Sequence, residues 1–119
     1  MEDKLHIHKS HCSNTQYIID NIPSRLSFEE TSLLFQLLND ATRLQIFWIL
    51  CHSEECVFNI ARLINISSPL VSFHLRFLKQ EKIIVSKRIG KEVHYKLADT
   101  EIANILKETV TKLIKTKQK

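Results

Sequence analysis

The chain has 119 residues, of which 44% are apolar and 25% charged, and it contains one glycine and two prolines. This composition fits one small, mainly helical domain and excludes chemistry that depends on glycine-rich phosphate-binding loops. No apolar run approaches the roughly 18 residues that span a bilayer, and the acidic, histidine-rich start is unlike a signal peptide, so we expect a cytoplasmic protein with no membrane partner.

The net charge of +4 conceals an asymmetry between the two halves of the chain. Residues 1–61 carry 4 Lys+Arg and 8 Asp+Glu, whereas residues 62–119 carry 13 and 5. Within residues 62–96 the numbers are 8 basic and 2 acidic side chains. This basic segment is therefore expected to face an acidic partner such as nucleic acid.

Residues 1–13 show no helical or strand periodicity and are expected to form a mobile arm. The stretch from His6 to Cys12, "HIHKSHC", holds three imidazoles and a thiol. Zinc, cadmium and copper prefer such nitrogen and sulfur donors, but a firm site usually needs four donors fixed in space. The stretch is thus either part of a metal site or a solvated end of the chain. The odd total of three cysteines argues against a disulfide framework.

Two helices are predicted after the arm. Residues 14–22 favour a short helix that ends before Pro23. Ser27 is expected to begin the next helix, because "SFEE" has the form of a capping box in which Ser27 and Glu30 satisfy each other's free amides.

Residues 41–52 predict a core helix capped by Asp40. Its apolar side chains recur at three- and four-residue spacing. Cys51 lies inside this apolar run and is expected to be a buried small hydrophobe.

Two further helices joined by a tight turn are predicted at residues 56–65 and 69–82. Ser67 or Ser68 can supply the N-cap oxygen of the second, and Pro69 suits its first turn. The apolar side of this second helix is expected to comprise Leu70, Phe73 or His74, Phe77 and Leu78. A basic second helix after a short turn is typical of a helix-turn-helix.

After residue 82 the spacing of apolar residues changes from helical to alternating, which is typical of strands. Residues 83–88 and 92–97 predict a β-hairpin that turns at Gly90, the residue able to adopt positive φ. Asp99 is expected to cap a final helix. The apolar stripe of that helix comprises Ile102, Ile105, Leu106, Val110, Leu113 and Ile114. The domain core can cover part of this stripe and a second copy of the chain the rest.

These elements predict a mainly α fold with a β-hairpin wing, a winged helix-turn-helix. Its second helix would read base edges while basic side chains bind phosphates. The candidate groove-facing residues are Ser68, Ser72 and Phe73, and the candidate phosphate-binding residues are Arg76, Lys79, Lys87, Arg88 and Lys91. A small helical adaptor with a lysine-rich face is the alternative.

Over about residues 27–115 the sequence resembles the ArsR/SmtB family of metal-responsive winged-helix repressors. The resemblance rests on four motifs with family spacing. They are the N-D-x-x-R-L start of the core helix, the E-x-C-V lead into the helix-turn-helix, V-S-x-H-L-x-x-L in the recognition helix and G-K-x-x-x-Y in the wing. It implies a homodimer formed through the first and last helices, a pseudo-palindromic double-stranded DNA operator, and release of that operator when a metal binds.

The chain has donor residues at one of the family's metal sites and lacks them at another. The site between paired terminal helices would fall on Asp99, Glu101, Lys112 and Lys115, and two lysines would repel a dication. The resemblance is greater to the cadmium-, lead- and zinc-sensing members, which join an arm to the E-x-C-V cysteine. The metal ligands it implies are His8, Cys12 and Cys56, with His11 or His6 as a fourth donor. Such a set suits Zn(II) or Cd(II), with Pb(II) and Cu(I) as further candidates.

Two neighbouring positions depart from the family. Phe58 stands where some sensors carry a second cysteine, and Asn59 where a zinc sensor carries an aspartate, which argues against an arsenite site on this helix. His74 and His94 are flanked by apolar residues and are expected to be packed or phosphate-contacting imidazoles rather than metal ligands.

The expected organisation is an arm at 1–13, a winged-helix and dimerisation domain at 14–115 and a basic tail at 116–119. Two other functions fit the residues. One is a redox-responsive repressor that uses Cys51 and Cys56, and the other is a metal-binding protein without a DNA role. No motif combines a nucleophile, a base and an orienting group, so an enzyme and an organic cofactor are not expected.

Overall fold

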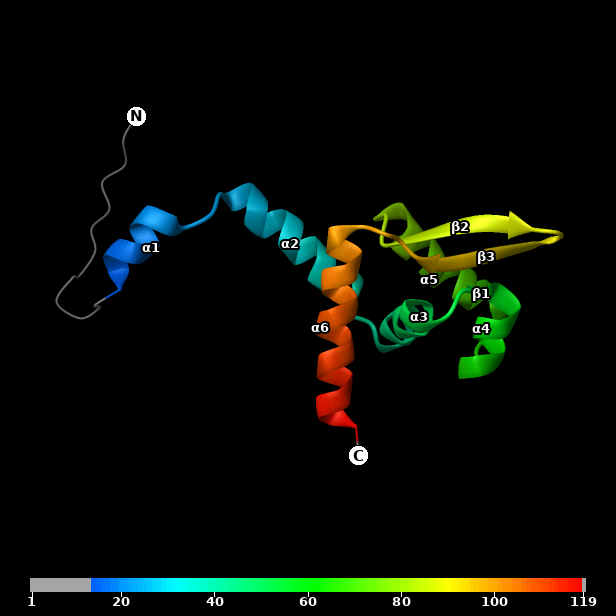
Figure 1. The fold of residues 1–119 in the computed structure, drawn as a ribbon. Helices are drawn as coiled ribbons and strands as arrows, with labels where there is room; N and C mark the ends of the chain where they lie inside the picture. Colours follow the sequence, from blue (N-terminus) through cyan, green and yellow to red (C-terminus); the bar gives the residue numbers. More distant parts are fainter. Residues whose placement is uncertain (1–13, 119) are drawn as a thin grey trace. The chain divides into compact units, whose positions relative to one another are not determined.

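The computed structural model describes residues 14–118, and Figure 1 shows their order in the chain. Contacts between residues divide the chain into two units, 1–33 and 34–119. The first unit contains α1 (Thr15–Asn21) and the beginning of α2 (Arg25–Leu37). The second contains the remaining elements and the hydrophobic core. No helix of the described residues is long and apolar enough to cross a membrane.

The start of α2 differs from the sequence prediction. The helix begins at Arg25, and Ser24 caps it because the Ser24 hydroxyl accepts a hydrogen bond from the backbone amide of Ser27 at 3.2 Å. Ser27 therefore lies inside the helix, and the predicted capping box at Ser27 is wrong. Both serines are good capping residues. The first helix ends at Asn21, and the next begins only four residues later at Arg25, which puts Ser24 at the N-cap.

The centre of the second unit is α3 (Ala41–His52), whose buried side chains include Ile46, Phe47 and Leu50. The Asp40 carboxylate accepts from the Arg43 backbone amide at 2.8 Å, which confirms Asp40 as the N-cap. The predicted core helix at 41–52 is present with these bounds.

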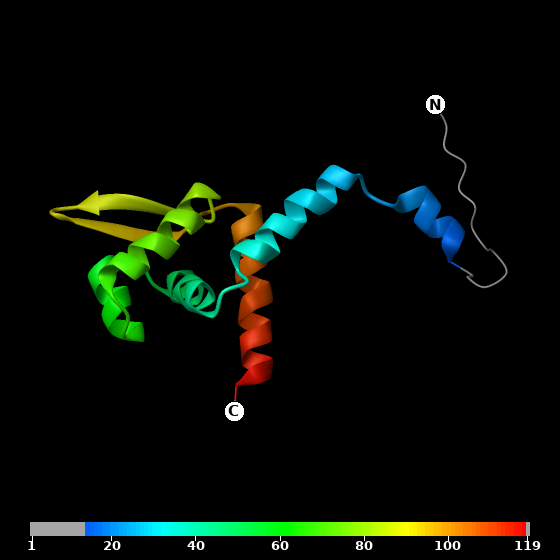
Figure 2. The same ribbon diagram turned by 180° about the vertical axis from the view of Figure 1, so that it is seen from behind.

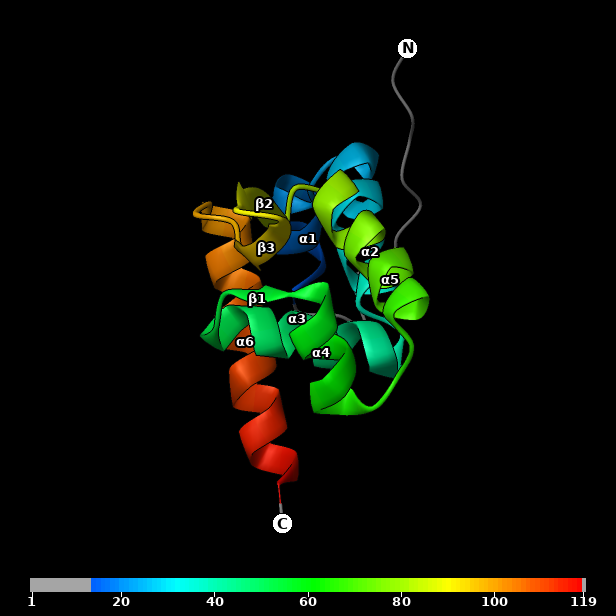
Figure 3. The ribbon, with the colours of Figure 1, turned by 90° about the vertical axis from the view of Figure 1, so that its right-hand side faces the viewer.

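The helix-turn-helix consists of α4 (Val57–Ile64) and α5 (Ser68–Gln80), which pack against each other. Figure 3 shows them side by side. Helix α4 ends at Ile64, and its C-cap Asn65 has a φ of 56°, the left-handed conformation common after helices. The Ser67 hydroxyl accepts from the Leu70 amide at 3.3 Å, so Ser67 is the N-cap of α5 and Pro69 lies in its first turn.

The buried face of α5 is only partly the predicted one. It comprises Val71, His74, Leu75 and Leu78. Leu70, Phe73 and Phe77 are instead exposed. The apolar residues of α5 occupy two adjoining stripes, and contacts with α3 and α4 decide which stripe enters the core.

A three-stranded antiparallel sheet follows, with the strand order β1-β3-β2. β2 (Ile84–Ile89) and β3 (Glu92–Leu97) form the predicted hairpin, and Gly90 turns it with a φ of 64°. β1 (Glu55–Cys56) was not predicted. It pairs with the outer side of β3 and so ties the entrance of α4 to the wing. The hairpin extends beyond the helices of the second unit in both views (Figures 1 and 2).

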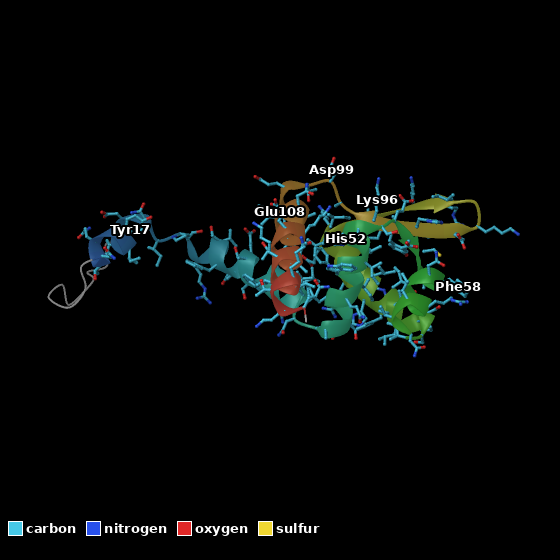
Figure 4. The ribbon with its side chains drawn as sticks, turned by 60° about the horizontal axis from the view of Figure 1, so that its bottom comes forward. Tyr17, His52, Phe58, Lys96, Asp99 and Glu108 are labelled. Atoms are coloured by element: carbon cyan, nitrogen blue, oxygen red, sulfur yellow. The ribbon has the colours of Figure 1, made fainter. Side chains whose placement is uncertain are left out.

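The chain ends with α6 (Glu101–Lys117), which packs against α3. The Thr100 hydroxyl accepts from the Ala103 amide at 3.2 Å, so Thr100 and not Asp99 caps the helix. Asp99 lies in the preceding turn (Figure 4). Ala103 and Val110 are buried, while Ile102, Ile105 and Leu113 are more than half exposed. The core thus covers one side of the predicted stripe and leaves the other free.

Candidate nucleic-acid interface and metal site

The candidate DNA-contacting residues come from two elements of the second unit, α5 and the hairpin. Most of these side chains are exposed, and Ser72 is half-buried. The α5 members are Ser68, Ser72, Phe73, Arg76 and Lys79, and the hairpin members are Lys87, Arg88 and Lys91. Helix α5 packs against β2, and this contact fixes the position of the helix relative to the wing. This arrangement fits a helix in the major groove flanked by phosphate-binding cations.

A polar contact fixes α5 to the start of α3. The Arg43 guanidinium donates from Nε to His74 Nδ1 at 3.2 Å and from Nη1 to the Leu37 carbonyl at 3.0 Å. His74 is buried, as predicted, and burial lowers its pKa, opposed by the nearby Asp40 carboxylate. The Arg43 guanidinium also lies 4.6 Å from the centre of the Phe77 ring. Arg43 therefore joins the start of α3 to the buried His74 and the exposed Phe77 of the recognition helix.

Phe73 is 43% exposed and lies on α5 beside Phe77, with ring centres 5.1 Å apart in an edge-on arrangement. The remaining exposed part of the ring can touch a thymine methyl but cannot donate a hydrogen bond to a base. Phe73 is thus an exposed apolar side chain of α5, and its predicted contact with bases stays a prediction.

The structure corrects the position of Cys56. The residue does not begin the helix but ends β1 and stands as the N-cap of α4, with its side chain 5% exposed. In the strand register it lies opposite His94 of β3. Its thiol is free. Movement of Cys56 would act on both α4 and the wing.

The other proposed metal donors, His6, His8, His11 and Cys12, lie outside the described residues. Within residues 14–118, no group of three His, Cys, Asp or Glu side chains is placed to hold a metal ion. Cys56 would therefore need donors from elsewhere to complete a site.

The two positions near Cys56 where family sensors carry further metal ligands have no such ligand here. Phe58 is exposed on α4 (Figure 4), and the Asn59 amide donates to the Glu55 carboxylate at 3.1 Å. The residues at the positions of the family's terminal-helix site are all exposed: Asp99, Glu101, Lys112 and Lys115. The two lysines leave that location short of donors.

Cys51 is buried among the core side chains of α3, as the sequence predicted. Burial raises the pKa of its thiol to about 11, with a small opposing effect from Lys107. A thiol with this pKa is almost entirely protonated at neutral pH, so Cys51 is a poor nucleophile and a poor metal ligand.

Sequence reasoning missed the surroundings of Cys56. The Glu54 carboxylate lies 3.8 Å from Lys87 Nζ and 3.9 Å from His94 Nδ1. These contacts exist because β1 pairs with β3, and a two-residue strand leaves no periodic signal in the sequence. The Glu54–Lys87 ion pair and the Glu54–His94 contact connect the segment before α4 to the wing.

The fold defines the class of protein: a winged helix-turn-helix DNA-binding protein with a basic recognition helix and wing. The sequence model described as "Bacterial regulatory protein, arsR family" matches residues 40–86. The cadmium resistance transcriptional regulatory protein CadC of Listeria innocua is 34% identical over 106 residues, which cover 88% of this chain and 80% of that protein. The chain therefore belongs to the ArsR/SmtB family of transcriptional repressors.

A further relative is similar in sequence, and a solved structure is similar in fold. The transcriptional repressor SmtB homolog of Synechocystis is 27% identical over 103 residues, covering 87% of this chain and 78% of that protein. The solved structure of the homodimeric winged helix-turn-helix domain of Mb0332 from Mycobacterium bovis aligns with a TM-score of 0.67 at 22% identity. That alignment covers 83% of this chain and 93% of the other. The matched proteins are transcriptional regulators rather than enzymes, as predicted.

Proposed function

We propose that this protein is a cytoplasmic, homodimeric repressor that leaves its operator when a soft or borderline metal ion binds at Cys56. The observation that carries the proposal is the position of Cys56, which caps the first helix of the helix-turn-helix and pairs with the wing. The metal-responsive names of the relatives, cadmium resistance regulator among them, support a metal as the inducer.

The DNA-binding half of the proposal rests on charge and exposure. Arg76 and Lys79 on α5, and Lys87, Arg88 and Lys91 on the wing, are exposed cations on the two elements that a winged helix presents to DNA. Such cations bind phosphates and set the register, while Ser68, Ser72 and Phe73 face the bases. A two-fold dimer then matches a pseudo-palindromic operator.

Dimerisation is supported by apolar surface that the described chain does not cover. On α6 this surface comprises Ile102, Ile105 and Leu113, and α1 and α2 add further exposed apolar side chains. The exposed members on α1 and α2 are Tyr17, Ile18, Leu26, Phe28, Leu33 and Phe35. Large exposed apolar side chains of this kind mark an interface on a small protein. Mb0332, which shares the fold, is itself described as homodimeric.

The metal site would combine Cys56 with His8 and Cys12 of the arm, and with His11 or His6 as a fourth donor. Two thiolates and two imidazoles form a tetrahedral set that suits Zn(II) or Cd(II), while Pb(II) or Cu(I) could use fewer of them. Because Cys56 is almost fully buried, donors from outside reach its thiol only after a local shift. A metal would therefore favour a conformation other than this one.

Release of DNA follows from linkage. A metal that binds the shifted conformation more tightly weakens operator binding by the same factor, typically about 1 to 3 kcal/mol. The shift would start at the entrance of α4 and reach α5 and the wing through their contacts with α4 and β1.

The redox alternative is less well supported, because burial leaves Cys51 protonated and within the core. A metal carrier without a DNA role would have no use for exposed cations gathered on a recognition helix and wing.

The proposal is tested with a reporter gene placed behind the protein's own upstream DNA in a bacterial host. The wild type should repress the reporter. Addition of a zinc, cadmium, lead or copper salt should restore expression. Cys56→Ser should stay repressed with every metal, while Cys51→Ala should respond like the wild type. Induction of the Cys56→Ser variant by the same metal would contradict the proposed site.

A further inference from the structure

A cluster of polar and aromatic side chains joins the start of α3 to the recognition helix α5. At its centre is His74, a buried residue of α5. Its Nδ1 accepts a hydrogen bond from Arg43 Nε at 3.2 Å. Because a guanidinium has donors and no acceptor, this contact requires a lone pair on Nδ1. The geometry therefore specifies a neutral imidazole that carries its proton on Nε2.

Two charged groups face the His74 ring from the start of α3. Its Nε2 lies 4.0 Å from Asp40 Oδ1, while Nδ1 faces Arg43. Among residues 14–118, these are the two charged groups that act on the His74 pKa. Helix α4 and strand β2, which also pack against α5, contribute no such charge. The ring thus lies between a cation that opposes its protonation and a carboxylate that favours it.

The same cluster extends to the exposed face of α5. The Phe73 ring lies edge-on to the His74 ring, with centres 5.4 Å apart, and edge-on to the Phe77 ring at 5.1 Å. The Arg43 guanidinium lies 4.6 Å from the centre of the Phe77 ring. Both phenylalanines are partly exposed, and Phe73 is a proposed base contact. His74 therefore lies against a side chain that is proposed to face DNA.

Protonation of His74 would disrupt this cluster. A proton on Nδ1 removes the lone pair that accepts from Arg43 and turns the atom into a donor. Two positively charged donors would then face each other in a site where burial limits screening by salt. The imidazolium would be drawn toward Asp40, and the guanidinium would be pushed away from His74 and Phe77.

We propose that His74 is a positioning residue for the recognition helix and holds α5 in its DNA-binding arrangement only while its ring is neutral. The inference rests on the proposed function, because it requires that α5 contacts the operator. If the DNA-bound form excludes the proton, linkage makes operator affinity fall as the protonated fraction rises.

The pH range follows from the surroundings of the ring. Burial lowers the pKa of His74 below its usual 6.5. Operator affinity is therefore complete above pH 6.5 and is lost as the pH falls through the lowered value. The sign separates this effect from an ordinary gain of charge, because protonation of an exposed histidine adds a cation and strengthens binding to DNA phosphates.

The test is fluorescence anisotropy of the full-length, metal-free protein on its own upstream DNA, between pH 7.5 and 5 at constant ionic strength. His74→Asn keeps an acceptor oxygen in place of Nδ1 and cannot bind a proton. His52→Asn is the control, since His52 is exposed at the end of α3 (Figure 4) and contacts the Trp48 carbonyl. Circular dichroism at each pH checks that the proteins are folded. ¹⁵N NMR of the wild type reports the tautomer and the titration of His74 without any variant.

We expect the wild type to lose operator affinity by roughly 5-fold or more, relative to His74→Asn, over the range in which the His74 ring titrates. His52→Asn should follow the wild type. At pH 7.5 the NMR spectrum should show a proton on Nε2 and none on Nδ1. Asp40→Asn keeps a capping oxygen and should move the loss of affinity to lower pH, because it removes the carboxylate that favours the imidazolium.

Equal pH profiles for the wild type and His74→Asn would overturn the inference. A ring that carries its proton on Nδ1 at pH 7.5, or that stays neutral throughout the range, would do the same. If His74→Asn does not fold, the wild type decides alone, and an affinity that rises or stays level while His74 titrates contradicts the inference. None of these results touches the proposed function, which fails instead if the wild type does not bind its upstream DNA at pH 7.5.

Discussion

The Arg43 side chain donates to His74 across 3.2 Å, and this contact joins the start of the core helix to the buried face of the recognition helix. The same guanidinium donates to the Leu37 carbonyl. The Arg43→Leu substitution would leave both acceptors without their donor. We expect a loss of roughly 1–3 kcal/mol in the free energy of unfolding, measured by urea denaturation.

Arg62→Leu is the matched control for this substitution. Arg62 is an exposed residue of α4 whose guanidinium lies 5.5 Å from the Phe58 ring. An exposed contact of this kind is worth about 0.5–1 kcal/mol. Equal losses for the two variants would show that the buried network around His74 contributes nothing beyond an ordinary surface arginine.

The lowered pKa of His74 predicts a pH dependence of stability. The unfolded chain binds a proton near the ordinary pKa of 6.5, whereas burial makes the folded protein bind it only at lower pH. The stabilisation is therefore complete above pH 6.5 and is lost as the pH falls toward the folded pKa. Asp40 also has a lowered pKa, set mainly by its hydrogen bond from the Arg43 amide, but its usual value of 3.8 places its effect in a more acidic range.

The measurement is the free energy of unfolding of the wild type and His74→Gln between pH 7.5 and 5. The wild type should lose stability more steeply, because the variant lacks the titrating ring. Parallel curves for the two proteins would mean that His74 binds its proton equally well in both states.

Sequence reasoning located the elements whose local chemistry is unambiguous. Asp40 is a good capping residue directly before a periodic apolar run, and Gly90 is the one glycine at a strand-to-strand turn. It failed where two neighbours compete for one role, as with Ser24 and Ser27 or Asp99 and Thr100, because backbone geometry makes that choice.

The candidate site could be predicted from the sequence only in part. The exposed cations of α5 and the wing follow from the order of the elements. The partners of Cys56 do not, because they depend on β1 pairing with a strand about 40 residues later in the chain. The burial of Val71 and Leu75, in place of Leu70 and Phe73, likewise depends on tertiary packing.

The exposed apolar stripe of α6 predicts the effect of a charge in the dimer interface. Ile105→Asp should shift the protein from dimer to monomer in sedimentation experiments, because a buried, unpaired carboxylate is costly. Asn104→Asp places the same group on the neighbouring exposed position of α6 and should leave the dimer intact. A dimeric Ile105→Asp variant would place the interface elsewhere.

The exposed cations of the wing predict how DNA binding depends on salt concentration. Arg88 is exposed on β2, and its removal should leave one DNA phosphate without its cation. For Arg88→Ala the slope of log Kobs against log salt concentration should become shallower by about 0.9 for each phosphate that is no longer neutralised. Lys112→Ala, on α6, removes the same charge and should leave the slope unchanged. An unchanged slope for both variants would mean that Arg88 does not bind DNA.

The most direct test of metal sensing at Cys56 is the fluorescence anisotropy of the protein bound to its own upstream DNA, titrated with Zn(II), Cd(II) and Cu(I) under reducing conditions. We predict that at least one metal releases the wild type at about one equivalent per subunit. Cys12→Ser and Cys56→Ser should remain bound over the same range, and Cys51→Ala should be released. Retention of the wild-type complex with every metal, or release of Cys56→Ser at the same equivalence, would contradict metal sensing at Cys56.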